Sequence, residues 1–127
     1  MNDFQEVLKD FINTLNLPLH ARLDYFQTDD DLVIYSLPGG KIDKEFMDGT
    51  REMSLNFEIA VKTQDQRKAN DTMWAINQAL SDLRLSLPSQ NKSYNFMSLD
   101  VEKPFLNDKN EKGFYVYLLD VTAHIEI

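Results

Sequence analysis

The chain has 127 residues, of which 43% are hydrophobic and 27% charged, and its acidic side chains outnumber the basic ones to give a formal net charge of −8. This length and balance predict one globular domain over residues 1–127 and exclude a disordered polymer. The negative charge disfavours specific nucleic-acid binding, because such binding needs Lys and Arg to neutralise phosphates.

The longest apolar runs are far shorter than the roughly 20 residues that cross a bilayer, so no membrane contact is expected. The first residues lack the basic segment and apolar core of a secretion signal. The sequence contains no cysteine, which excludes disulfides and a thiolate nucleophile. Together these features favour an intracellular origin.

The chain begins with a helical pattern. Asp3 and Glu6 have the spacing of a capping box, and apolar residues then recur at intervals of three and four. This pattern predicts an amphipathic helix over residues 3–16, ended by the proline at position 18.

Two short strands are predicted next, over residues 21–27 and 32–37, separated by an acidic turn. This arrangement predicts a hairpin. Residues 39–50 begin with Gly39-Gly40 and are mostly polar, so they predict an exposed loop with little fixed structure.

Strict alternation over residues 53–62 predicts a half-buried strand. Its apolar face comprises Leu55, Phe57, Ile59 and Val61. Thr63 and Gln66 offer a second capping box. The helix that follows is predicted over residues 65–84, with an apolar stripe at helical spacing formed by Ala69, Met73, Ile76, Leu80 and Leu83.

The remaining elements are strands. Residues 93–102 predict a strand in which the alternation slips by one residue, which indicates a bulge near Phe96. Residues 107–113 predict a charged hairpin loop. Residues 115–127 alternate throughout and predict a long strand that is central or heavily paired, in an antiparallel hairpin.

These elements predict an α+β fold. Alternating strands indicate a mostly antiparallel sheet that is polar on one face. The N-terminal helix and the one longer helix would pack on the other face.

No motif in the sequence identifies a catalytic, cofactor-binding or metal-binding residue. Gly39-Gly40-Lys41 has part of a phosphate-binding loop, but Tyr35 stands where that motif needs its first glycine and Ile42 where it needs a hydroxyl. A plain turn is the favoured interpretation, and the same features predict that the protein neither binds nor hydrolyses nucleotides.

Acidic and histidine residues also lack the spacing of a metal site. Asp29, Asp30 and Asp31 are consecutive, whereas cation-binding loops alternate their ligands around a sharp glycine turn, so a solvated acidic turn is favoured. His20 and His124 stand alone, and His124 is predicted to be exposed on the polar face of the last strand. Carboxylates that converge only in space, as in glycosidases, are left open by these patterns.

Two aromatic positions are candidate contact residues. Trp74 lies off the apolar stripe of its helix, where it either marks a second contact surface or covers a flank of the sheet. Phe46 and Met47 form an apolar centre within the polar residues 39–50. This combination suits a subunit contact, with packing of Phe46 on its own domain as the alternative.

The whole pattern resembles the minor capsid or tail-terminator proteins of long-tailed bacteriophages and prophages of Gram-positive bacteria. The N-terminal helix and the segments after it carry this resemblance, namely Leu37-Pro38-Gly39-Gly40, Phe46-Met47-Asp48-Gly49, Phe57-Glu58-Ile59-Ala60-Val61, the helix with Ala69 and Leu80, Ser93-Tyr94-Asn95-Phe96 and Gly113-Phe114-Tyr115-Val116-Tyr117.

The resemblance implies a structural virion protein without catalytic residues, assembled in the host cytoplasm. It would form a homo-oligomeric ring, usually a hexamer, at the head-proximal end of the tail tube. The ring would stop tube growth and join the tube to the head connector proteins, and its acidic charge would keep passing DNA from sticking. Two alternatives are a head-completion or connector adaptor of the same particle and a small enzyme or ligand-binding domain.

Overall fold

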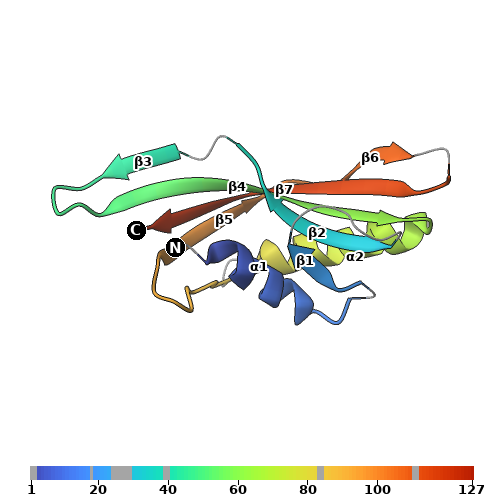
Figure 1. Ribbon diagram of the computed structural model, residues 1–127, viewed down its shortest axis with the longest axis horizontal. Helices are drawn as coiled ribbons and strands as arrows, with labels where there is room; N and C mark the ends of the chain where they lie inside the picture. The colour runs from blue at the N-terminus through green and yellow to red at the C-terminus, as the bar shows by residue number, and fades with distance from the viewer. Residues whose placement is uncertain (1–2, 18, 24–29, 39–40, 83–84, 110–111) are drawn as a thin grey trace.

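The computed structural model describes residues 3–17, 19–23, 30–38, 41–82, 85–109 and 112–127. The elements in chain order are α1 (Phe4–Asn13), β1 (Ala21–Leu23), β2 (Asp31–Ser36), β3 (Lys41–Glu45), β4 (Arg51–Thr63), α2 (Gln66–Leu80), β5 (Asn95–Val101), β6 (Phe105–Lys109) and β7 (Tyr115–Glu126). Both helices lie on one side of the sheet (Figure 1), which confirms the predicted α+β architecture.

The sheet is built around β4 and β7. These two strands are antiparallel partners from Glu52 opposite Glu126 to Thr63 opposite Tyr115. β2 and β3 pair with the other edge of β4, and β5 and β6 pair with the other edge of β7, all antiparallel. The prediction of a mostly antiparallel sheet with a long central last strand is confirmed.

The alternation of β4 places its apolar side chains against the helices, as predicted. Phe57 lies 5.3 Å from the ring of Phe4 on α1, measured between centroids. Ile76 and Leu80 of α2 lie in the same core. The core residues with no exposed surface include Phe4, Leu8, Ile12, Leu32, Ile34, Ile59, Met73, Ile76, Leu119 and Ile125.

The predicted capping box of α1 is wrong. Asp3 precedes the helix, but its carboxylate makes no cap bond. It accepts instead from the backbone N–H of Gln90 at 2.9 Å and of Asn91 at 3.2 Å, and from the hydroxyls of Ser89 and Ser93. These bonds tie the connection before β5 to the start of the chain, and they hold the pKa of Asp3 below its ordinary value despite the opposing effect of burial. The helix ends at Asn13, earlier than predicted.

The predicted capping box of α2 is also wrong, because the helix is capped two residues later than predicted. Asp65, and not Thr63, is the N-cap, and its carboxylate accepts from the N–H of Lys68 at 3.1 Å. Thr63 belongs to β4, and its hydroxyl accepts from the N–H of Asp65 at 3.2 Å. An aspartate at this position satisfies an N–H of the first turn that has no partner within the helix.

The sequence predicts a hairpin of β1 with β2, and this prediction is wrong. The two strands pair in the parallel direction. Two interactions hold β1 in this direction. The side chain of Asn13 bonds both the N–H and the carbonyl of Ala21, at 2.7 and 3.1 Å. Arg22 forms an ion pair with the buried Asp31 at the start of β2. Residues 24–27, the rest of the predicted strand, lie outside the described residues.

Residues 41–50 are not the predicted loop without fixed structure. They form β3 and a tight turn that returns the chain to β4. In the turn, the N–H of Phe46 donates to the carbonyl of Thr50 at 2.8 Å, and the Asp48 carboxylate accepts from the N–H of Thr50 at 2.9 Å. Gly49 has a φ of 90°, a conformation that side chains other than glycine rarely adopt.

The bulge predicted in the strand after α2 is confirmed, because the pairing of β5 with β7 shifts between Phe96 and Ser98. The loop predicted over residues 107–113 is shorter than expected, since β6 continues to Lys109. Gly113 has a φ of 85° immediately before β7.

Candidate interaction surfaces

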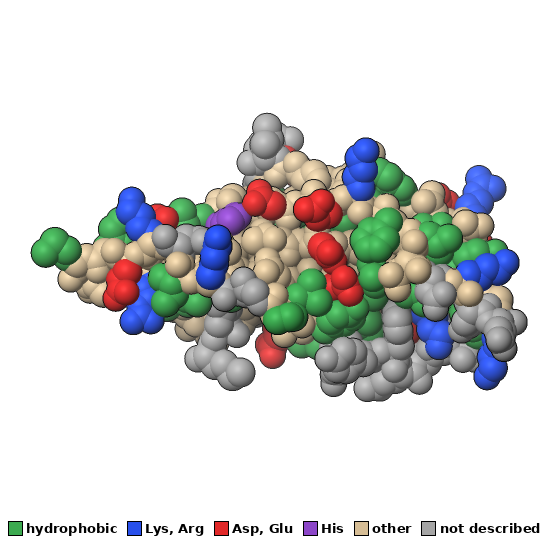
Figure 2. Space-filling model, turned by 90° about the horizontal axis from the view of Figure 1, so that it is seen from above, with side chains coloured by type: hydrophobic (Ala, Val, Ile, Leu, Met, Phe, Trp, Pro, Cys, Tyr) green, Lys and Arg blue, Asp and Glu red, His purple; other side chains and the backbone are tan. Residues whose placement is uncertain are grey.

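The face of the sheet opposite the helices, here called the open face, has no helix over it in the described residues (Figure 1). Figure 2 shows Asp and Glu side chains gathered in the middle of this face, with Lys and Arg lying mainly toward its two ends. Because side chains alternate along each strand, β4 and β7 present to this face the opposed pairs Glu52–Glu126, Ser54–His124, Asn56–Thr122, Glu58–Asp120, Ala60–Leu118 and Lys62–Val116.

The centre of the open face is a carboxyl cluster formed by Glu58, Glu102 and Asp120. Glu58 and Asp120 lie directly opposite each other on β4 and β7. The hydroxyl of Tyr35 donates to Glu58, and the N–H of Glu102 donates to the backbone carbonyl of Asp120 at 3.0 Å. Burial, together with a hydrogen bond to Glu58 and the charges of Glu58 and Glu102, raises the pKa of Asp120 to about 7. Carboxylates this close are more stable when one of them keeps its proton.

The β3–β4 hairpin, residues 41–51, is the second surface with distinctive chemistry. It extends past the ends of the helices to one end of the molecule (Figure 1). At its tip Met47 is fully exposed and Phe46 is 36% exposed. The ammonium of Lys44 lies 5.0 Å from the centre of the Phe46 ring, within the range of a cation–π contact. The tip therefore combines apolar surface with positive charge.

A sequence model of the family described as bacteriophage tail terminator protein matches residues 7–127. The chain belongs to the bacteriophage tail terminator family. Membership of this family implies that the protein is a structural component of the virion and that it contacts phage tail and head proteins. One solved protein structure shares the fold of this tail terminator with a TM-score of 0.56 and 17% identity, covering 96% of this chain and 89% of its own. No protein of curated function is significantly similar in sequence.

The histidines of the tail terminator make separate local contacts. His124 lies on the polar face of β7, as predicted, but it is half-buried rather than exposed. Its Nδ1 is 3.1 Å from the Ser54 hydroxyl, and its Nε2 is 2.8 Å from the Asp100 carboxylate. His20 lies before β1, with Nε2 3.4 Å from the side-chain amide of Asn13. The structure does not bring the two histidines together.

The predicted solvated acidic turn is wrong for Asp31, which is buried in β2 and paired with Arg22. Asp30 lies 3.4 Å from the ammonium of Lys68, and Asp29 lies outside the described residues. Within the described part of the chain, no group of three or more His, Asp or Glu side chains is placed to hold a metal ion. None of the helices described is long and apolar enough to cross a membrane.

Lys41 opens strand β3 opposite Ser54, so its backbone is extended rather than folded into the predicted turn. Gly39 and Gly40 lie outside the described residues. Trp74 is 41% exposed on α2, partly available as a contact residue.

The carboxyl cluster was not predicted from the sequence. Glu58 and Asp120 each occupy the polar phase of an alternating strand, which is the local signal. Their meeting depends on the pairing register of β4 with β7, which local alternation does not encode.

We expect the substitution Asp120→Asn to remove a pH dependence of stability. The folded protein holds the Asp120 proton up to about pH 7, whereas the unfolded chain releases it near its ordinary pKa of 3.8. Between these values the folded state binds more protons, so its stability should fall as pH rises and then level off above pH 7. The amide of the Asp120→Asn variant has no proton to lose, so this variant should be more stable than the wild type at about pH 8.

Urea unfolding of both proteins at about pH 4.5, 6 and 8 measures this effect as the difference between them. The pKa values of Asp3 and Asp48 are lowered, so these groups titrate below this window in both proteins. A difference that stays constant from about pH 4.5 to 8 would contradict the predicted role of Asp120.

Proposed function

We propose that this single-domain tail terminator assembles into a hexameric ring at the head-proximal end of the tail tube. There the ring stops growth of the tube protein and joins it to the head connector proteins. The β3–β4 hairpin is the observation that carries this proposal. Its exposed apolar tip stands clear of the core of its own subunit, as expected for a contact with another chain.

The full exposure of Met47 favours a subunit contact at the tip, whereas Phe46 is partly covered by its own chain, including Lys44. Interface centres are enriched in aromatic residues and Met, and their rims are polar. The hairpin has this composition, with Phe46 and Met47 at the turn and Lys44 and Asp48 beside them. A ring contact joins different surfaces of neighbouring subunits, so the hairpin needs a complementary surface elsewhere on the chain.

The double variant Phe46→Ser/Met47→Ser is expected to abolish rings on tail tubes and to give overlong tails. The unfolding midpoint of the isolated subunit should stay within the range of surface substitutions, since the turn is held by backbone bonds and by Asp48. Electron microscopy of the protein mixed with tail tubes measures ring formation and tail length.

Met97→Ser is the matched control, because Met97 is 48% exposed on β5 and lies outside the hairpin. This variant should form rings normally. Tails of normal length with the double variant at Phe46 and Met47 would contradict the proposal. A large fall in the unfolding midpoint of this double variant would mean that the tip packs on its own subunit.

A further inference from the structure

The open face carries acidic groups close together, and the subunit relieves only part of their repulsion, because the raised pKa of Asp120 lets this group keep its proton up to about pH 7. Two acidic pairs lie directly opposite each other across β4 and β7, namely Glu58 with Asp120 and Glu52 with Glu126. Like charges at directly opposed positions destabilise a sheet. A positive group from outside the subunit would convert this repulsion into attraction.

A specific acceptor atom lies within the carboxyl cluster. Oδ1 of Asp120 is buried and has no hydrogen-bond partner among the described residues. A buried polar atom without a partner costs free energy, which a donor supplied by another molecule would recover once the Asp120 side chain turns toward that donor. An ammonium group provides both the donor and the compensating charge.

Apolar side chains lie next to this cluster along the same strands. Phe105 of β6 is 45% exposed and lies opposite Leu118, which is two residues from Asp120 on β7. Leu118 in turn lies opposite the buried Ala60. The open face thus offers carboxylates beside an apolar shelf, defined as Phe105 and Leu118.

The tip of the β3–β4 hairpin has the complementary chemistry. Two of its acids already interact within the hairpin: Glu45 lies 3.6 Å from Arg51, and Asp48 binds the N–H of Thr50. The outward groups include the ammonium of Lys44 over the Phe46 ring and the side chain of Met47. The Lys44 ammonium can pair with the carboxylates of the cluster, and the apolar side chains of Phe46 and Met47 can pack on the apolar shelf.

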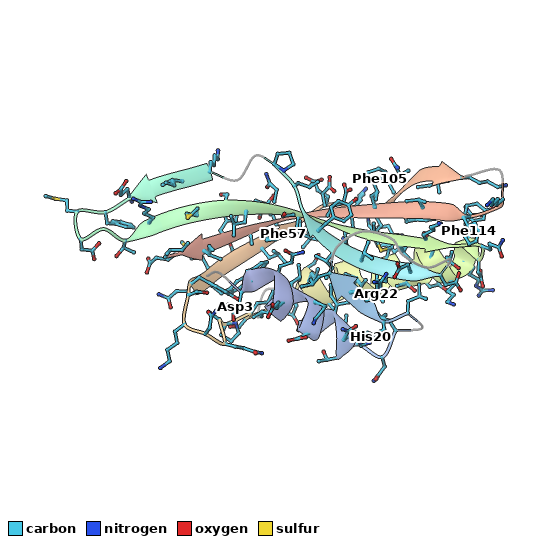
Figure 3. The ribbon with its side chains drawn as sticks, viewed as in Figure 1. Asp3, His20, Arg22, Phe57, Phe105 and Phe114 are labelled. Carbon is cyan, nitrogen blue, oxygen red and sulfur yellow. The ribbon has the colours of Figure 1, made fainter. Side chains whose placement is uncertain are left out.

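The hairpin and the shelf of one subunit cannot meet. The hairpin continues the sheet at one end of the molecule, and Phe105 lies toward the other end (Figures 1 and 3). The hairpin tip must therefore find this surface on a second copy. Such a contact joins two different surfaces and repeats from copy to copy, as a ring requires.

We propose that the β3–β4 hairpin of one subunit docks on the open face of the next, with Lys44 at the carboxyl cluster and with Phe46 and Met47 on the apolar shelf. This inference rests on the proposed ring. It identifies the partner of the hairpin as a second copy of this chain and the recognised surface as the centre of the open face.

Charge reversal on each surface tests the contact. Lys44→Glu and Glu102→Lys each place like charges against each other and should weaken self-association at least about tenfold. The double variant restores opposite charges and should recover most of the association. Both residues are exposed, so the subunits should remain folded, as unfolding midpoints will show. Lys92→Glu, at an exposed position before β5, is the matched control and should associate normally.

Sedimentation of the isolated chain and electron microscopy with tail tubes measure association and rings. Rescue by the double variant supports the docking. Rings of the wild type that persist unchanged in both single variants overturn the docking and leave the proposed function standing. Failure of Glu102→Lys to join tubes or heads, with rings intact, assigns the open face to a different virion protein and also overturns the docking. A wild-type chain that forms no rings contradicts the proposed function and this docking together.

Discussion

Replacing Phe57 with Ala is expected to lower the free energy of unfolding by about 3–5 kcal/mol, the range for truncating a large buried aromatic side chain. Phe57 is 5% exposed in the middle of β4. It packs on Phe4, which also contacts the rings of Tyr94 and Phe96 at 5.6 and 6.3 Å. The truncation would leave a cavity at the junction of α1 with the sheet.

Denaturant unfolding measures this loss. Ser36→Ala is the control, because Ser36 lies opposite Phe57 on β2 but is exposed. Its effect should stay within roughly 0.5 kcal/mol, as for other surface substitutions. A loss below about 1 kcal/mol for Phe57→Ala would place this side chain outside the core.

Replacing Ile76 with Ala is expected to cost about 2–5 kcal/mol, since truncating a buried Ile loses apolar contact and opens a cavity. Ile76 has no exposed surface and belongs to the apolar stripe of α2 that faces the sheet. Its loss should weaken the docking of the helix on β4 and β7.

Arg67→Ala in the same helix is the control for Ile76→Ala. The Arg67 side chain is 92% exposed, and its ion pair with Asp71 is long, at 3.9 Å. An exposed pair of this kind contributes at most about 1 kcal/mol. Ala has the highest helix propensity, so propensity cannot explain a loss in either variant. Equal losses for the two variants in denaturant unfolding would therefore contradict the predicted contribution of Ile76 packing.

The elements with strong periodicity were predictable from sequence. The apolar alternation of β4 and β7 and the stripe of α2 as far as Leu80 each have one arrangement that buries their apolar side chains, and the structure has that arrangement. The helix ends at Leu80, before the predicted residue 84, and Leu83 lies outside the described residues. The bulge near Phe96 was predictable for the same reason, because a one-residue slip would otherwise turn apolar residues to solvent.

The errors concern features that depend on distant contacts. β3 is polar and exposed, so its strand conformation comes from pairing with β4 rather than from its own pattern. The parallel direction of β1 is supported by Asn13 and Asp31, which lie in other elements. Asp3 has the spacing of a cap, but the N–H groups of residues 90 and 91 take its carboxylate.

Of the two candidate surfaces, one was predictable from local sequence and the other was not. Phe46 and Met47 were candidate contact residues from the sequence because they form an apolar pair among mostly polar residues, and the structure shows both at the surface. The carboxyl cluster was not, because Glu58 and Asp120 become neighbours only through the register of two strands. Local sequence identifies polar faces, whereas strand register determines which charges meet on them.

The central position of β7 sets the order in which a newly synthesised chain can fold. β5 and β6 precede β7 in the chain, yet both pair with it, and β4 has β7 as a partner along nearly its whole length. Contacts between segments so far apart in sequence form late and slowly. Until β7 leaves the ribosome, one long edge of β4 is open and prone to incorrect pairing. The subunit should therefore reach its native sheet only after β7 has been synthesised, when β7 closes that edge.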